Sequence, residues 1–217
     1  MRALNSLDFK KLMDEDENII VLDGRHADVF AEGHIPGAIL ISFNEYFEQW
    51  LTTLIPSGRK ILLVCDEQDA RAMAEQLDRS GRSVPLGWLE GGMDAWLANH
   101  QEFHLVIRVE ADELAMDLPY DERLLVVDVR TEAEFAEGHV RDAMNIPMRS
   151  LSDTMTLSLI EEEQHLYICG SSDEKSMMAA SVLLHQGYTQ LRTVDGGWDV
   201  IRKQKGIPIE KETDKLN

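Results

Sequence analysis

Residues 21–41 read VLDGRHADVFAEGHIPGAILI, and residues 126–146 read VVDVRTEAEFAEGHVRDAMNI. The two stretches align at an offset of 105 positions, and the tetrapeptide Ala-Glu-Gly-His is identical in both. The match extends through each half of the chain, at Asp23 and Asp128, Arg25 and Arg130, Phe30 and Phe135, and Glu90-Gly91-Gly92 and Asp195-Gly196-Gly197. A repeat of this length predicts two similar domains, which we place at residues 1–103 and 104–217.

Each half alternates short apolar runs with helix-like segments. Residues 19–22 and 61–64 in the first half correspond to residues 124–127 and 166–168 in the second, and all four runs have the length of a strand. The helix-like segments that follow the later runs are residues 71–79 and 176–186. Strands that alternate with helices favour an α/β fold, in which helices flank a central parallel sheet in each domain.

The composition excludes several classes of function. The chain of 217 residues carries 40 Asp and Glu against 21 Lys and Arg, a net charge of −19. Such an acidic surface disfavours nucleic acids and anionic membranes as partners. No apolar run is long enough to cross a bilayer, and the start of the chain does not resemble a signal peptide. With two cysteines, a disulfide scaffold is not expected, and we predict a cytoplasmic protein.

Each cysteine directly follows an apolar run and precedes a helix-like segment. Cys65 aligns with Cys169 at an offset of 104. Backbone N–H groups and the positive end of a helix would lower the pKa of a thiol at such a place and stabilise a persulfide anion. We therefore expect Cys169 to be a nucleophile and Cys65 to be a second candidate. The alternative for each is a small buried core residue.

These motifs resemble the rhodanese (sulfurtransferase) family over nearly the whole chain, twice. The resemblance rests on Asp-x-Arg at the end of a strand, on Phe-Ala-Glu-Gly-His-Ile-Pro-Gly-Ala at 30–38, on a strand that ends in cysteine, and on Glu-Gly-Gly-Met-Asp-Ala-Trp at 90–96. It implies a domain whose active loop starts at the cysteine. It also implies that this cysteine takes sulfur from a donor and passes it to a nucleophile. Activation of the thiol by backbone N–H groups requires no metal, and we expect no cofactor.

The loops depart from the Cys-x-x-Gly-x-Arg-Ser pattern of the family. The predicted substrate-binding loop of the second half consists of Gly170, Ser171, Ser172, Asp173, Glu174, Lys175 and Ser176. If Lys175-Ser176 takes the place of Arg-Ser, this loop is one residue longer than usual. In the first half, Cys65 is followed by Asp66, Glu67 and Asp69, which would raise its pKa and repel an anion. Arg71 lies six residues after Cys65, as in the loop of Cdc25-type phosphatases.

The sequence thus predicts a sulfurtransferase that moves sulfane sulfur from thiosulfate or a persulfide to a thiol or protein acceptor. The Asp23/Arg25 and Asp128/Arg130 pairs are expected to be structural ion pairs beneath the loops. One alternative is a non-catalytic rhodanese-like binding or regulatory module, because both loops depart from the family pattern. A phosphatase or arsenate-reductase-like enzyme at Cys65 is a third hypothesis, which the local carboxylates disfavour.

Overall fold

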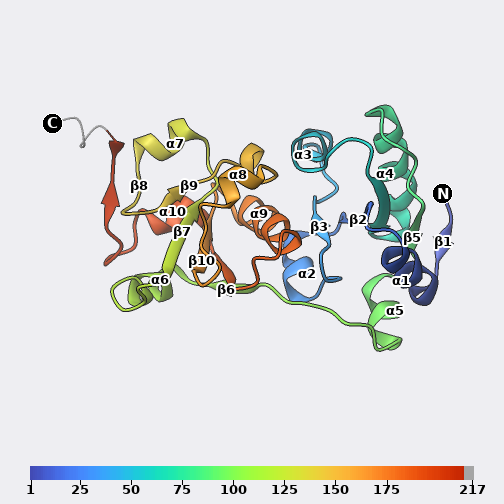
Figure 1. Cartoon of the computed structure of the whole chain (residues 1–217), viewed down its shortest axis with the longest axis horizontal. Helices are drawn as coiled ribbons and strands as arrows, with labels where there is room; N and C mark the ends of the chain where they lie inside the picture. Colours follow the sequence, from blue (N-terminus) through green and yellow to red (C-terminus); the bar gives the residue numbers. More distant parts are fainter. Residues whose placement is uncertain (213–217) are drawn as a thin grey trace. The chain divides into compact units, whose positions relative to one another are not determined.

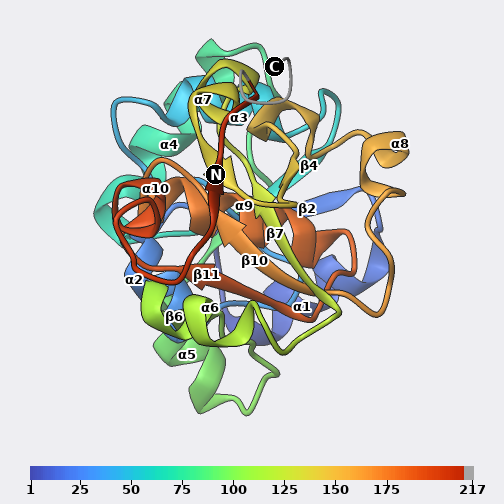
Figure 2. The ribbon, with the colours of Figure 1, turned by 90° about the vertical axis from the view of Figure 1, so that its left-hand side faces the viewer.

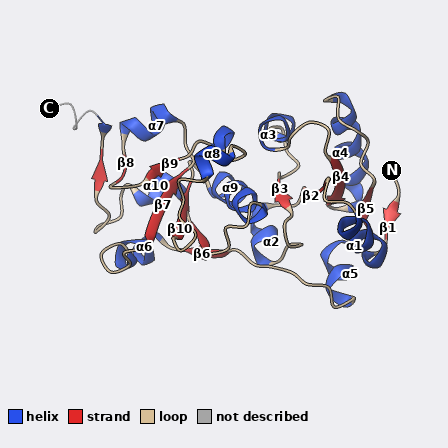
Figure 3. Ribbon diagram, in the orientation of Figure 1, coloured by secondary structure: helices blue, strands red, loops and turns tan. Residues whose placement is uncertain are grey.

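The computed structural model describes residues 1–212. The chain forms two compact units, which divide between Leu105 and Val106 and which we describe one at a time. Figure 1 follows the chain through both, and Figure 3 shows the alternation of strands and helices in each. The predicted fold class is confirmed, because each unit contains a parallel sheet with flanking helices.

The first unit has a parallel sheet of five strands in the order β1-β5-β4-β2-β3. The central strands β2 and β4 are buried along almost their whole length, as in a sheet covered on both faces. The elements in chain order are β1 (Ala3–Leu4), α1 (Ser6–Glu15), β2 (Ile19–Asp23), α2 (Ala27–Glu32), β3 (Ile39–Leu40), α3 (Phe47–Leu54), β4 (Lys60–Val64), α4 (Glu67–Arg79), β5 (Gly87–Leu89) and α5 (Gly92–Ala98).

The second unit repeats this topology, with the parallel order β6-β11-β10-β7-β9, and adds the antiparallel pair β12-β8. Its elements are β6 (Ile107–Val109), α6 (Ala111–Asp117), β7 (Leu124–Asp128), α7 (Glu132–Glu137), β8 (His139–Val140), β9 (Met144–Asn145), the 3-10 helix η1 (Met148–Ser150), α8 (Thr154–Leu157), β10 (His165–Cys169), α9 (Asp173–His185), β11 (Leu191–Val194), α10 (Gly197–Ile201) and β12 (Ile209–Glu210).

The two faces of the second sheet are covered by different helices. Side chains that alternate along a strand point to opposite faces. One set, which includes Tyr167 and Cys169, packs in a core with residues of α6 and α10. Helix α9 packs beside β10 and β11, and Figure 2 shows β7, β10 and β11 running side by side. A side chain at the end of β10 therefore contacts either the core with α6 and α10 or the start of α9, depending on the face of the sheet to which it points.

The helices after the cysteines begin earlier than the sequence pattern indicated. Helix α4 begins at Glu67 and α9 at Asp173, four and three residues before the predicted starts. Ser172 caps α9, because its hydroxyl accepts a hydrogen bond from the Lys175 N–H at 3.4 Å. Acidic residues in both first turns suit the positive end of a helix. In residues 1–212, no helix is long and apolar enough to span a membrane.

Candidate functional site

The sheet register shows that the two cysteines do not occupy equivalent positions. Asp23 pairs with Val64 across β2 and β4, whereas Asp128 pairs with Cys169 across β7 and β10. The backbone hydrogen bonds just after these pairs show the same register. The Gly24 N–H donates to the Val64 oxygen at 2.8 Å, and the equivalent Val129 N–H donates to the Cys169 oxygen at 2.9 Å. The structural counterpart of Cys169 is therefore Val64. The alignment of the two cysteines at an offset of 104 is wrong by one residue.

The counterpart of Cys65 is Gly170, the first residue after β10. If the loop is counted from Gly170, Lys175 and Ser176 fall on the Arg and Ser positions of the family pattern. The second loop thus has the usual length, which corrects the extra residue inferred from the sequence. The residue at its first position, where the family carries the nucleophile, is a glycine.

Cys169 lies in the core of the second unit. Its side chain is 0% exposed and packs with Val126, Val194 and other apolar residues. The thiol lies 3.9 Å from the Gly170 carbonyl oxygen, to which it donates. Burial and the nearby Asp128 carboxylate raise the pKa of Cys169, although Arg130 acts in the opposite direction. The expected lowering of this pKa is wrong, because the alternation of β10 turns the side chain into the core.

The polar groups of the second loop bond to one another. The Gly170 N–H donates to Ser176 Oγ at 2.9 Å, and Lys175 Nζ donates to Ser171 Oγ at 3.0 Å. Glu174 is half-buried in the first turn of α9. A Cβ on residue 170 would lie 3.0 Å from both the backbone nitrogen and Oγ of Ser176. A side chain at this position would therefore face the first turn of α9, unlike that of Cys169.

The Gly196-Gly197 turn closes over this loop. The Trp198 N–H donates to the Gly170 oxygen at 2.9 Å, and a Cβ on Gly197 would lie 2.6 Å from the same oxygen. Asp173 of the predicted substrate-binding loop accepts a hydrogen bond from the Gly196 N–H at 2.6 Å. The equivalent Gly92 of the first unit has no atom within 4 Å of its Cβ position. Close packing of turn against loop is thus specific to the second unit.

Cys65 stands at the first loop position of its unit but is 4% exposed. Helix α4 begins two residues later, so little loop is left to surround a substrate. The nearby Gly24 has no room for a side chain, because a Cβ there would lie 2.5 Å from Met73 Cε and 3.6 Å from Cys65 Cβ. Burial, together with the carboxylates of Asp23, Asp69 and Asp66, raises the pKa of Cys65 to about 12. The sequence-based expectation of an unfavourable charge environment agrees with this direction.

Arg71 does not complete an anion site at Cys65. Its side chain is 90% exposed, and its Nε donates to Glu75 Oε1 at 3.0 Å. The residue lies in the second turn of α4, where it pairs along the helix surface. The phosphatase-like spacing of Cys65 and Arg71 therefore does not bring a guanidinium to the thiol, and its placement in the predicted substrate-binding loop is wrong.

The Asp-x-Arg pairs form the same buried structure in both units. Arg25 Nη2 lies 2.6 Å from Asp23 Oδ2, and Arg130 Nη2 lies 2.6 Å from Asp128 Oδ2. Each guanidinium also donates to the carbonyl oxygen of the glycine in the Ala-Glu-Gly-His repeat, at 2.8 and 2.7 Å. Arg130 additionally lies 4.0 Å above the Trp198 ring. These bonds explain why Asp, Arg and Gly recur together, since they tie the strand end to the following turn.

Comparison with known proteins identifies the family. The family model described as "Rhodanese-like domain" matches residues 6–99 and 110–204. A sulfurtransferase of Allochromatium vinosum is 30% identical over 105 residues, which cover 48% of this chain and 95% of the relative. The thiosulfate sulfurtransferase GlpE of Pseudomonas putida is 31% identical over 90 residues, covering 42% and 80%. The chain belongs to the rhodanese-like domain family, and it carries the domain twice.

Solved structures resemble this chain at lower similarity. A thiosulfate sulfurtransferase from Pseudomonas aeruginosa is similar over 98% of this chain and 44% of its own, with 17% sequence identity and a TM-score of 0.43. A rhodanese-like domain protein from Staphylococcus aureus is 25% identical, with a TM-score of 0.42, over 49% of this chain and 100% of its own. The activities in these names belong to the relatives.

Proposed function

We propose that this rhodanese-family chain is a protein-binding or regulatory module rather than an efficient sulfurtransferase. The observation that carries the proposal is the occupant of the first loop position in the second unit. Gly170 stands where the family pattern places the nucleophile, and the neighbouring Cys169 points into the core. Without a thiol at that position, the loop and the start of α9 have no sulfur to activate.

The first unit supports the same proposal for a different reason. Its thiol is at the right position, but a pKa of about 12 leaves almost none of Cys65 ionised at neutral pH. The helix that should favour an anion begins with Glu67 and Asp69, which offset its positive end. Both domains thus retain the family fold, but neither loop provides an environment that stabilises an ionised cysteine.

The second candidate is the sulfurtransferase expected from the sequence, now with Cys65 as the better placed thiol. In that reaction, a thiolate attacks the sulfane sulfur of thiosulfate, the S–S bond breaks, and sulfite leaves. A thiophilic acceptor such as cyanide then takes the sulfur as thiocyanate and returns the thiolate. The names of the relatives and the place of Cys65 between β4 and α4 favour this candidate. A carrier role for Cys169 requires the closed loop to open.

A thiocyanate assay separates the candidates. The protein is incubated with thiosulfate or polysulfide, cyanide is added, and thiocyanate is measured for the unchanged chain, Cys65→Ser and Cys169→Ser. We expect the same background rate in all three. A rate well above background that disappears with Cys65→Ser would establish the second candidate, and one that disappears with Cys169→Ser would restore the role first predicted for that residue.

A further inference from the structure

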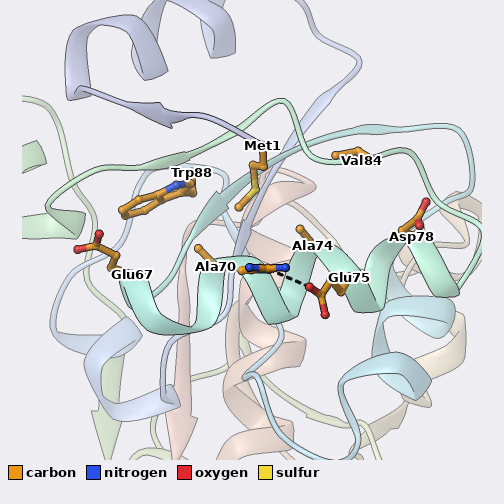
Figure 4. A pocket seen from close by; sticks show the side chains of 9 residues that line it. Met1, Glu67, Ala70, Ala74, Glu75, Asp78, Val84 and Trp88 are labelled. Atoms are coloured by element: carbon orange, nitrogen blue, oxygen red, sulfur yellow. Dashed lines mark hydrogen bonds and ion pairs between the residues drawn. The ribbon is translucent and has the colours of Figure 1, made fainter.

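A hollow of about 490 Å³ lies on the first unit, along α4, and Cys65 is not among the residues that line it. Three segments that are distant in the sequence form it, namely Met1, the outer face of α4 and residues 84–88. Figure 4 shows their side chains around the hollow. Its volume lies within the range of about 300–1,000 Å³ typical of ligand pockets.

The middle of the hollow is apolar. Ala70 and Ala74 lie one helical turn apart and leave space above α4, and the half-buried Trp88 lines the hollow toward its Glu67 end (Figure 4). Met1 and Val84, which are 46% and 55% exposed, contribute further apolar surface. Apolar surface that includes a tryptophan is typical of the centre of a protein interface.

The rim of the hollow is acidic. Glu67 and Trp88 lie at one end and Asp78 lies at the other (Figure 4). Among residues 1–212, neither Glu67 nor Asp78 takes part in an ion pair. The one guanidinium on the rim, Arg71, is neutralised by Glu75. Three carboxylates against one guanidinium and the Met1 ammonium leave the hollow with an excess of negative charge, in keeping with the net charge of −19 of the chain.

We propose that this hollow binds an extended segment of a partner protein that has apolar side chains in its middle and a Lys or Arg at each end. This inference rests on the proposed binding function. Glu67 and Asp78 are separated by about 16 Å along α4, at 1.5 Å per residue. An extended chain covers that distance with about five residues. One basic side chain would lie between Glu67 and the face of Trp88, and the other beside Asp78.

A pair of peptides tests the charge pattern on the full chain. The probe is fluorescein-labelled acetyl-Lys-Ser-Leu-Ser-Leu-Ser-Lys-amide, and the matched peptide has Glu in place of both Lys. Fluorescence anisotropy at low salt should give a dissociation constant for the Lys peptide at least about tenfold lower than for the Glu peptide. Equal binding of both peptides, or no binding of the Lys peptide at about 1 mM, would overturn the proposal.

Matched variants locate the site. The double variant Glu67→Lys/Asp78→Lys should weaken binding of the Lys peptide at least about tenfold. The control Glu45→Lys/Glu48→Lys changes the net charge equally at exposed positions outside the hollow and should change binding less than about twofold. Equal weakening by both would mean attraction to the net charge alone and would refute the site. The thiocyanate assay is independent of this result, so active Cys65 chemistry would refute the proposed function without deciding peptide binding.

Discussion

Cys65 and Gly170 occupy the same position in the two domains, the first residue after the central strand. The second cysteine, Cys169, is the last residue of its strand and points into the core. A shift of one residue along a strand exchanges the faces of the sheet. For this reason, two cysteines that look equivalent in the sequence lie in different environments, and the loop with the more usual length lacks the nucleophile.

Introducing a thiol at the vacant position should create activity. In Gly170→Cys, the side chain would point at the backbone nitrogen and hydroxyl of Ser176, in the first turn of α9. The turn must yield by a few tenths of an ångström, because a Cβ there lies only 3.0 Å from these atoms. We expect thiocyanate formation from thiosulfate and cyanide at least about tenfold above the unchanged chain, a gain of about 1.4 kcal/mol in transition-state stabilisation.

The control for this gain is Gly170→Ser, which adds a side chain of similar shape without a thiol. It should leave the rate at background. If Gly170→Cys folds, as judged by circular dichroism, and still produces no more thiocyanate than Gly170→Ser, then the missing nucleophile is not what limits the second domain.

The reactivity of Cys65 should follow its raised pKa. With the pKa of Cys65 at about 12, the thiolate fraction at pH 7 is about 10⁻⁵, roughly a thousandfold below that of a free cysteine. Labelling of Cys65 by iodoacetamide in the Cys169→Ser variant should therefore be slow and should rise about tenfold per pH unit from pH 7 to 10. Mass spectrometry of the labelled peptide gives the rate.

The neighbouring carboxylates supply part of this effect. Asp66→Asn/Asp69→Asn should lower the pKa of Cys65 and speed labelling at pH 7, because both carboxylates raise that pKa. Glu75→Gln removes a carboxylate that pairs with Arg71 on the surface of α4 and should leave the rate unchanged. Rapid labelling of the unchanged Cys65 at neutral pH would contradict the closed environment described for it.

Much of the fold could be predicted from the repeat. The Ala-Glu-Gly-His match and the Asp-x-Arg pairs predicted two copies of one domain, and in both copies the Arg bonds the glycine of that tetrapeptide. The four strands predicted from apolar runs, β2, β4, β7 and β10, match the structure almost to the residue, because buried parallel strands are continuous apolar runs. The same continuity hides the face to which each residue points, so the pattern could not show that Cys169 faces the core.

The misplaced cysteine could have been recognised from the offset. Every other match in the repeat lies 105 positions apart, which places Cys65 opposite Gly170. The early helix starts also had a signal, since Asp66 and Ser172 are residue types that favour the position before a helix. The hollow beside α4 had none, because Met1, Ala74 and Trp88 meet only in the folded chain.

The close packing of the second loop should make its glycine turn sensitive to substitution. Gly92 and Gly197 are equivalent and have φ angles of +56° and +54°, so an alanine at either pays a similar backbone penalty of about 1–2 kcal/mol. At Gly197, the new Cβ would also lie 2.6 Å from the Gly170 oxygen, whereas at Gly92 it would meet nothing within 4 Å. We expect Gly197→Ala to lose about 1–3 kcal/mol more. Hydrogen exchange of the β4 and β10 amides measures each domain separately, and equal losses would contradict tight turn–loop packing.

The stability of the first domain should fall in mild acid because of His34. Its ring is 1% exposed and stacks on Phe30, and burial lowers its pKa to about 4. The unfolded chain holds a histidine near pKa 6.5, so between pH 6.5 and 4 it binds a proton that the folded chain does not. The free energy of unfolding should therefore have its highest value above pH 6.5 and decline by up to about 3 kcal/mol toward pH 4.

In the control variant His34→Gln, an amide can still donate to the Phe30 oxygen that accepts from Nδ1, but it does not titrate. Hydrogen exchange of β2 and β4 at pH 7, 6, 5 and 4.5 should show a shallower decline for this variant, and parallel pH profiles would mean that His34 does not supply the acid sensitivity.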